Sequence, residues 1–178
     1  GVLERPSDRT WQSDKTQGAT HLTIQTGHAI DYFCMCVGEF SEVAAQVSTQ
    51  VDQWRQTDTG HMVEVTAPDN ILVSGRLANG AVASVHVASV PWHGGGWTIR
   101  VFGRDGTLVV TQSDPGYGWM GGIQLLGGRS GDAALGELPI PERLTQLPEG
   151  VPEGPPENVA RLYRAWGESI RSGDRFEP

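Results

Sequence analysis

The first strong pattern in the chain lies between about residues 20 and 37. Mostly apolar side chains recur there at steps of three and four residues, which is the spacing of one face of an amphipathic helix. These positions are Leu22, Thr26, Ala29, Ile30, Phe33 and Val37. Gly38 follows, where a helix commonly ends in a left-handed residue. The sequence therefore predicts a helix over residues 20–37 with one face against a core.

The next stretch of the chain is typical of β-strands. Residues 43–51 alternate between apolar and polar side chains, as expected of a strand with one buried face. Two pairs of β-prone runs follow, at residues 69–90 and 97–111. Asn79-Gly80 joins the first pair and Asp105-Gly106 the second, and such dipeptides favour tight primed turns with positive φ angles. We expect two consecutive β-hairpins.

The two ends and the later middle of the chain are less regular. Residues 1–17 are polar without a period, and we expect a loop or a frayed strand there. Residues 112–156 are rich in Gly and Pro, with a short strand predicted at 123–126; this segment is either a functional loop or an excursion along a sheet edge. Pro155-Pro156-Glu157 then opens a second amphipathic helix. The order predicts an α+β fold, an open and mostly antiparallel sheet with helices packed on one face.

Composition restricts the function. The chain has 178 residues with 24 Gly and 11 Pro, and its 21 acidic against 13 basic residues give a net charge of −8. An acidic surface repels phosphate backbones, so we expect no nucleic-acid partner. No apolar run reaches the roughly 18 residues of a membrane span. Cys34 and Cys36 are expected to be reduced packing residues of a cytoplasmic protein.

Known catalytic motifs are missing from the sequence. Neither G-x-G-x-x-G nor G-x-x-x-x-G-K-[ST] occurs, so the chain has no recognised phosphate-binding loop of its own. It also lacks G-x-S-x-G, which leaves acyl transfer unsupported. The five histidines, which are His21, His28, His61, His86 and His93, include no i, i+4 ligand pair. Isolated surface or core histidines are the favoured interpretation, and no metal site is predicted.

One pair could still carry chemistry. His28 lies off the apolar stripe of the first helix, and Asp31 follows one turn later, where its carboxylate could orient the imidazole. An imidazole titrating near neutral pH can transfer a proton. The alternative is a surface histidine that simply pairs with its neighbour.

Several segments in a fixed order resemble a known family. They are GATHLTIQTGHAIDYF (residues 18–33), NILVSGRLANGAVAS (70–84) and IRVFGRDGTLVV (99–110). Together they resemble the C-terminal domain of the Gfo/Idh/MocA oxidoreductases, over about residues 9–178. The resemblance implies that residues 1–178 form a single substrate-binding and oligomerisation domain. It also implies that the Rossmann half, which would bind NAD or NADP, and the last helix are absent.

The resemblance also implies an activity and a site. The whole protein would oxidise a hydroxyl of a sugar, polyol or cyclitol by hydride transfer to NAD or NADP. His28 falls on the family's catalytic histidine and Asp31 on the final acid of its motif, implying a substrate contact. Arg9 and Trp11 stand where members often place sugar-contacting side chains, although a salt-bridged Arg and a Trp covering the core are equally good interpretations. Subunits would pair as a homo-oligomer through the open sheet face.

Ile24 departs from the family pattern, which has an aspartate four residues before the histidine. Without that carboxylate, the usual acid–base set is incomplete. The sequence also resembles the family branch that includes catalytically inactive sugar-regulon repressors. A non-catalytic homologue that senses a sugar or nucleotide is therefore the alternative function.

Overall fold

The computed structural model describes residues 3–89, 96–112, 122–145, 150–152 and 154–176. The chain forms two compact units, residues 1–94 and 95–178. His93, one of the five histidines, lies outside the described residues. The single-domain organisation expected from the sequence stays a prediction.

Helix α1 (Gln25–Val37) begins five residues later than its apolar pattern predicts. The preceding turn combines one helix-type backbone hydrogen bond, from the Ile24 amide to the Thr20 carbonyl at 3.0 Å, with hydrogen bonds of threonine side chains. The Thr20 amide donates to Thr23 Oγ1 at 2.9 Å, and Thr23 Oγ1 donates to the Gly18 carbonyl at 2.7 Å. Short hydroxyl side chains compete with the helical backbone in this way. At the other end, Gly38 has φ 103° and stops the helix as predicted.

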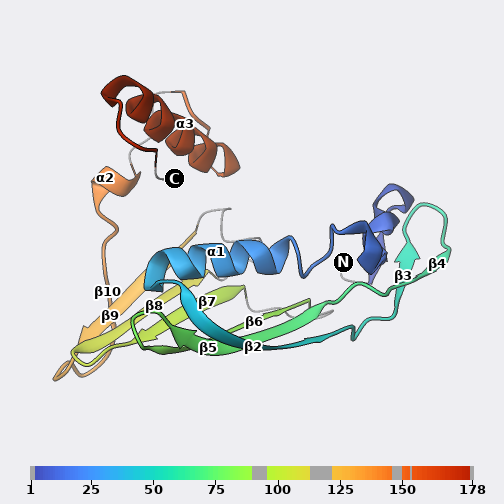
Figure 1. The fold of residues 1–178 in the computed structure, drawn as a ribbon, viewed down its shortest axis with the longest axis horizontal. Coiled ribbons are helices and arrows are strands. Elements are labelled where there is room, and N and C mark those ends of the chain that lie inside the picture. Colours follow the sequence, from blue (N-terminus) through green and yellow to red (C-terminus); the bar gives the residue numbers. More distant parts are fainter. Residues whose placement is uncertain (1–2, 90–95, 113–121, 146–149, 153, 177–178) are drawn as a thin grey trace. The chain divides into compact units, whose positions relative to one another are not determined.

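The main sheet of the first unit has the order β2 (Phe40–Ser48), β5 (Asn70–Leu77) and β6 (Val82–Ala88), all antiparallel. Helix α1 lies along one face of this sheet (Figure 1). The buried apolar residues of the helix and sheet are Cys34, Ile71, Val73 and Leu77. The predicted strand and first hairpin are therefore confirmed, and β5 is the central strand of this core.

The two cysteines have different environments. Both are free thiols, but Cys34 is buried and Cys36 is exposed. The expectation that both are packing residues is wrong for Cys36, because a step of two residues on a helix points a side chain to a different face. Burial raises the pKa of the Cys34 thiol.

A smaller sheet in the first unit was not predicted. It has the order β1 (Glu4–Arg5), β3 (Gln53–Gln56) and β4 (Met62–Glu64), with β1 parallel to β3. Two 3-10 helices, Ser7–Ser13 and Lys15–Gln17, connect β1 to the turn before α1. Strands of two to four residues carry too few alternating positions to stand out in a sequence.

The second unit contains a four-stranded antiparallel sheet and two helices. The sheet order is β10 (Gly136–Glu137), β9 (Gln124–Arg129), β8 (Gly106–Gln112) and β7 (Trp97–Phe102), followed in sequence by α2 (Glu142–Thr145) and α3 (Pro155–Ser172). This confirms the second hairpin, the short later strand and the second helix. The α+β class with open, mostly antiparallel sheets is confirmed. None of the described helices is both long and apolar enough to cross a membrane.

Both hairpin turns differ from the predicted primed turns. In the first, the Leu77 amide donates to the Ala81 carbonyl, which leaves a three-residue loop in which Gly80 has φ 89°. In the second, the Gly103 amide donates to the Gly106 carbonyl, so the two loop residues are Arg104 and Asp105. The dipeptides marked the turns correctly, but pairing between the strands set the loop lengths.

Candidate functional site

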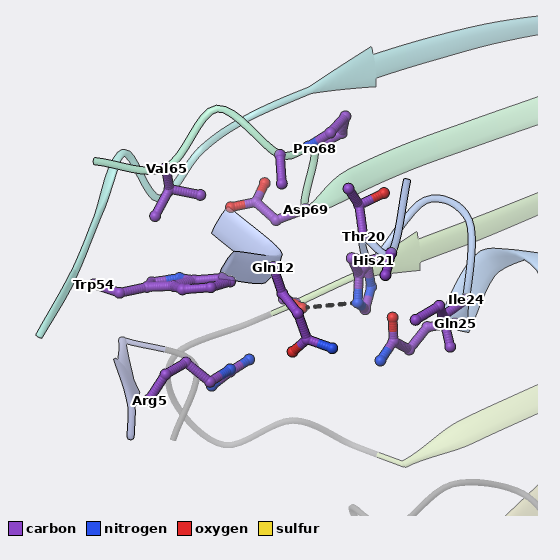
Figure 2. A pocket seen from close by; sticks show the side chains of 13 residues that line it. Arg5, Gln12, Thr20, His21, Ile24, Gln25, Trp54, Val65, Pro68 and Asp69 are labelled. Carbon is purple, nitrogen blue, oxygen red and sulfur yellow. Dashed lines mark hydrogen bonds between the residues drawn. The ribbon is translucent and has the colours of Figure 1, made fainter. Parts of the chain in front are cut away.

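A partly enclosed cavity of about 50 Å³ lies in the first unit, beside the turn that leads into α1. Figure 2 shows side chains from β1, a 3-10 helix, β3 and the segment directly before β5 around it. The lining residues are Arg5, Gln12, Ala19, Thr20, His21, Ile24, Gln25, Trp54, Val65, Ala67, Pro68, Asp69 and Ser89. The wall is thus a mixture of polar, charged and aromatic groups drawn from distant parts of the sequence.

His21 is the residue of the cavity wall whose side chain can titrate near neutral pH. Its Nδ1 lies 3.2 Å from the Ser89 hydroxyl oxygen (Figure 2). Its other ring nitrogen, Nε2, is buried, and no hydrogen bond of normal geometry reaches it within the described residues. A side-chain hydrogen bond with Gln25 raises the pKa of this ring. The ring therefore has polar neighbours in both Ser89 and Gln25.

The electrostatic surroundings keep His21 neutral. Burial lowers the pKa of His21 below its usual value, because the charged imidazolium loses solvation. The Asp69 carboxylate raises this pKa and the Arg5 guanidinium lowers it, both less strongly than burial acts. At neutral pH the imidazole is therefore uncharged, with one nitrogen donating and the other accepting.

The two charged side chains of the cavity have partners in the protein. The two carboxylate oxygens of Asp69 accept the backbone amides of Gln50 and Val51, each at 2.8 Å. The Arg5 guanidinium donates to the Glu4 carbonyl at 2.8 Å, and its central carbon lies 4.8 Å from the centre of the Trp54 ring. Asp69 therefore fixes the chain before β5, and Arg5 and Trp54 form a stacked wall.

The four residues expected to form the site lie on two neighbouring segments of the first unit. His28 and Asp31 are exposed on α1, one turn apart as predicted. Arg9 and Trp11 are exposed on the 3-10 helix Ser7–Ser13, with Trp11 49% exposed. None of the four lines the cavity, although Gln12 from the same 3-10 helix does. Their assignment as site residues stays a prediction.

Ile24 links the cavity to His28. Its side chain lines the cavity, and its carbonyl accepts the His28 amide at 3.0 Å, so His28 lies one helical turn further along α1. The position at which the family pattern has an aspartate thus faces this cavity. An apolar side chain there removes the acid but keeps the cavity wall.

Sequence reasoning missed the residues that the tertiary structure brings together at the cavity. His21 was noted only as one of five isolated histidines, and Arg5 and Trp54 carried no signal. Asp69 directly before a strong strand pattern was the one local hint, because carboxylates commonly accept backbone amides at such chain reversals. The spacing of the others follows no helical or strand period.

The described residues provide no obvious place for a metal or a dinucleotide. In the described ranges, no group of three or more His, Cys, Asp and Glu side chains could hold a metal ion. A nucleotide pyrophosphate typically binds a glycine-rich loop between a strand and a helix. Here α1 follows a threonine-bonded turn and two 3-10 helices. Within the residues that the structure describes, the segment before α1 therefore does not form a glycine-rich cradle for the pyrophosphate of NAD or NADP.

Comparisons with known proteins support one family. The family model of the Gal80p C-terminal domain matches residues 3–112. An uncharacterized oxidoreductase of Synechocystis sp. is 27% identical over 161 residues, which are 90% of this chain and 43% of that protein. The chain therefore spans less than half the length of this curated relative.

Solved structures show the same fold. A super-repressor mutant of Gal80p from Saccharomyces cerevisiae superposes with a TM-score of 0.75 at 19% identity, over 98% of this chain and 45% of that one. Levoglucosan dehydrogenase without ligands gives a TM-score of 0.72 at 23% identity, over 97% and 48%. The family model covers more than half of the chain, and α1, the sheets and the hairpins follow the order that the sequence predicts. The chain therefore belongs to the Gal80p C-terminal-domain family, as a C-terminal domain of the Gfo/Idh/MocA oxidoreductase type.

Proposed function

We propose that this chain is the substrate-binding and oligomerisation domain of an NAD(P)-dependent oxidoreductase. The whole protein would oxidise a hydroxyl of a sugar, polyol or cyclitol by hydride transfer, with NAD or NADP held mainly by residues outside this chain. The observation that carries the proposal is the family membership of the chain, supported by what two similar proteins are described to do. One relative is named an oxidoreductase, and a levoglucosan dehydrogenase of the same fold, at 22% identity and a TM-score of 0.70, is described in complex with NADH and levoglucosan.

His28 is the proposed proton-transfer residue. Its exposed position on α1 leaves the imidazole accessible to a substrate, and Asp31 one turn later is exposed on the same helix. Such a histidine would accept the proton of the substrate hydroxyl while the carbon that bears this hydroxyl transfers its hydride to the nicotinamide. Asp31, Arg9 and Trp11 are the proposed substrate contacts.

Steady-state kinetics of the complete protein test this assignment. Levoglucosan, myo-inositol and xylitol would be offered with NAD⁺ or NADP⁺, and formation of the reduced nicotinamide followed by absorbance. We expect His28→Asn to lower kcat/KM by roughly 10²–10⁴-fold, the usual contribution of a general base. His61→Asn, at an exposed histidine of the β3–β4 turn, is the matched control and should leave kcat/KM unchanged. A kcat/KM within a few-fold of wild type for His28→Asn would refute the role.

A second candidate function is regulation without catalysis, by binding a sugar or nucleotide. Ile24, in the position of the family aspartate, favours this function. The similarity to Gal80p from Kluyveromyces lactis, which is described as a transcriptional regulator, also favours it. That structure gives a TM-score of 0.69 at 19% identity, over 94% of this chain and 41% of that one. Binding of a polyol or nicotinamide cofactor without turnover under any of these conditions would support it. Turnover of any of the polyols would exclude it.

The proposed homo-oligomer would form through the face of the β2–β5–β6 sheet opposite α1. Of the four large apolar side chains exposed on these strands, two lie on this face, Leu72 at 39% and Val82 at 81%. A broad sheet face of this kind is commonly paired with a second copy. Val82→Arg should shift the complete protein toward the monomer in analytical ultracentrifugation. A monomeric wild type at micromolar concentration would contradict the proposed pairing.

A further inference from the structure

The turn of the first hairpin contains a chemically labile dipeptide, Asn79-Gly80. The backbone nitrogen of the residue after an asparagine can attack the side-chain amide, and glycine hinders this attack least because it has no side chain. Both residues are exposed, and a Cβ placed on Gly80 would meet nothing within 4 Å. The dipeptide is therefore open to solvent, which supplies the water that the reaction consumes.

Each of the other two asparagines of the chain precedes a β-branched residue. These pairs are Asn70-Ile71 and Asn158-Val159. A side chain that branches at Cβ is stiff and crowds the backbone nitrogen that has to attack. Asn79 is therefore the asparagine of this sequence that reacts most readily, and the other two serve as internal references.

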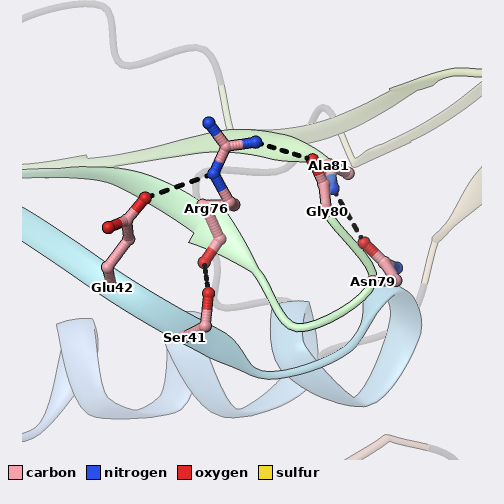
Figure 3. Close-up of polar contacts among 6 residues, drawn as sticks. All are labelled: Ser41, Glu42, Arg76, Asn79, Gly80 and Ala81. Atoms are coloured by element: carbon pink, nitrogen blue, oxygen red, sulfur yellow. Dashed lines mark hydrogen bonds and ion pairs between the residues drawn. The ribbon is translucent and has the colours of Figure 1, made fainter.

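In the folded protein, hydrogen bonds hold the groups that take part in the reaction. Nδ2 of Asn79 donates to the Val37 carbonyl at 3.1 Å, and Oδ1 accepts the Ala81 amide at 3.0 Å (Figure 3). The Gly80 amide, which carries the attacking nitrogen, donates to the Leu77 carbonyl at 2.8 Å. The attack therefore requires the turn to open first, and local opening of an exposed turn costs less than global unfolding.

We propose that Asn79 is a deamidation site that reacts when the hairpin turn opens, and that its product breaks the side-chain link between the hairpin and α1. The Gly80 nitrogen attacks Cγ of Asn79 and forms a cyclic succinimide. The Cγ–Nδ2 bond breaks, and Nδ2 leaves as ammonia with the proton of the Gly80 amide. Water then opens the succinimide at either carbonyl, which gives aspartate or isoaspartate. The net reaction consumes water and releases ammonia in equal amounts.

The contact with Val37 is the one that the product cannot form again. Val37 is the last residue of α1, so its carbonyl accepts no amide from within the helix. A carboxylate has no hydrogen to donate, and its charge is unfavourable at the negative end of a helix dipole. Aspartate can still accept the Ala81 amide, so the turn survives in that form. Isoaspartate lengthens the backbone by a carbon atom and disturbs the turn as well.

Peptide mapping by mass spectrometry identifies the site and the role of opening. The complete protein is aged at mildly alkaline pH with and without guanidinium chloride. In guanidinium, we expect Asn79 to convert at least about tenfold faster than Asn70 and Asn158. Without guanidinium, Asn79 should convert slower by about tenfold or more, because the turn has to open. Conversion of all three asparagines at one rate in guanidinium would overturn the proposed site, and equal rates at Asn79 under both conditions would overturn the role of opening.

A pair of asparagine variants tests the effect on α1. Asn79→Asp reproduces the aspartate product, and Asn158→Asp makes the same chemical change on α3 as the matched control. The Gly38 amide, which donates to the Cys34 carbonyl at 2.8 Å, reports on the end of α1 by hydrogen exchange in the complete protein. We expect Asn79→Asp to accelerate this exchange about tenfold and Asn158→Asp to leave it unchanged. Exchange at the wild-type rate in Asn79→Asp would overturn the loss of the link.

The aged wild-type protein gives the same information without a substitution. Deamidation converts a neutral amide into a carboxylate, so anion-exchange chromatography separates the converted molecules from the intact ones. The fraction with Asn79 converted should show the fast Gly38 exchange of Asn79→Asp, and the intact fraction should keep the exchange rate of fresh protein. The same Gly38 exchange in both fractions would overturn the proposal.

Discussion

The hairpins β5–β6 and β7–β8 carry the same sequence signal but use glycine for different reasons. Gly80 has φ 89°, and a Cβ placed there would meet nothing within 4 Å. Gly106 has no such φ, but a Cβ placed there would overlap with the Gly128 carbonyl oxygen of β9. A polar residue followed by glycine therefore marks a turn, without revealing whether backbone conformation or a close neighbour requires the glycine.

The hairpins also differ in how deeply the side chains of their strands are buried. Ile71 of β5 is 1% exposed, within the core formed with α1, whereas Ile99 of β7 is only half-buried. Figure 3 shows a set of polar contacts at the turn end of the first hairpin, including an exposed Arg76–Glu42 ion pair. The first hairpin thus forms the core of its unit. The stability of the second hairpin depends more on the hydrogen bonds between its strands.

The largest difference is expected from matched isoleucine truncations. Ile71→Ala should lower the free energy of unfolding by about 3–5 kcal/mol, since it leaves a cavity in a packed core. Ile99→Ala should cost about 1–2 kcal/mol, because a half-buried side chain loses fewer contacts. Urea unfolding followed by circular dichroism measures both. Equal losses would show that the second sheet has a core of the same quality.

The two turn glycines come next. Gly106→Ala should destabilise β8–β9 pairing by about 2–3 kcal/mol, because strand backbone has to move to accept the methyl group. Gly80→Ala should cost only about 1–2 kcal/mol, the strain of a left-handed residue in open space. Amide hydrogen exchange of the two hairpins distinguishes these local effects. If Gly80→Ala proved the more damaging, the close approach at Gly106 would not be what requires glycine.

The smallest effect concerns the polar residues beside the glycines. The Asn79 side chain accepts the Ala81 amide at 3.0 Å (Figure 3). It also donates to the Val37 carbonyl at 3.1 Å, which ties the turn to the end of α1. Asn79→Ala should therefore cost about 1 kcal/mol. Asp105 uses its backbone carbonyl to accept the Ser130 amide, so Asp105→Ala should change stability by less than about 0.5 kcal/mol. Thermal unfolding measures both, and a larger loss for Asp105→Ala would reverse the comparison.

The sequence predicted the long, periodic elements well. The stripe along α1 and the β-prone runs around Gly80 and Gly106 gave the right elements, because each element carries its own spacing of apolar residues. The start of α1 was predicted five residues too early, since the apolar pattern continues through the preceding turn, where threonine hydroxyls take part in the hydrogen bonds. The short strands β3 and β4 were missed for lack of a period.

The candidate site likewise has a part that the sequence predicted and a part that it did not. The sequence by itself determined the fold class and the placement of His28 and Asp31 one turn apart on an exposed part of α1, because helical periodicity is local. Only the tertiary structure decided that Arg5, His21 and Asp69 line one cavity and that His21 lies there with a buried nitrogen. Burial and the pKa of a histidine depend on neighbours contributed by distant segments, and no local spacing relates those segments to one another.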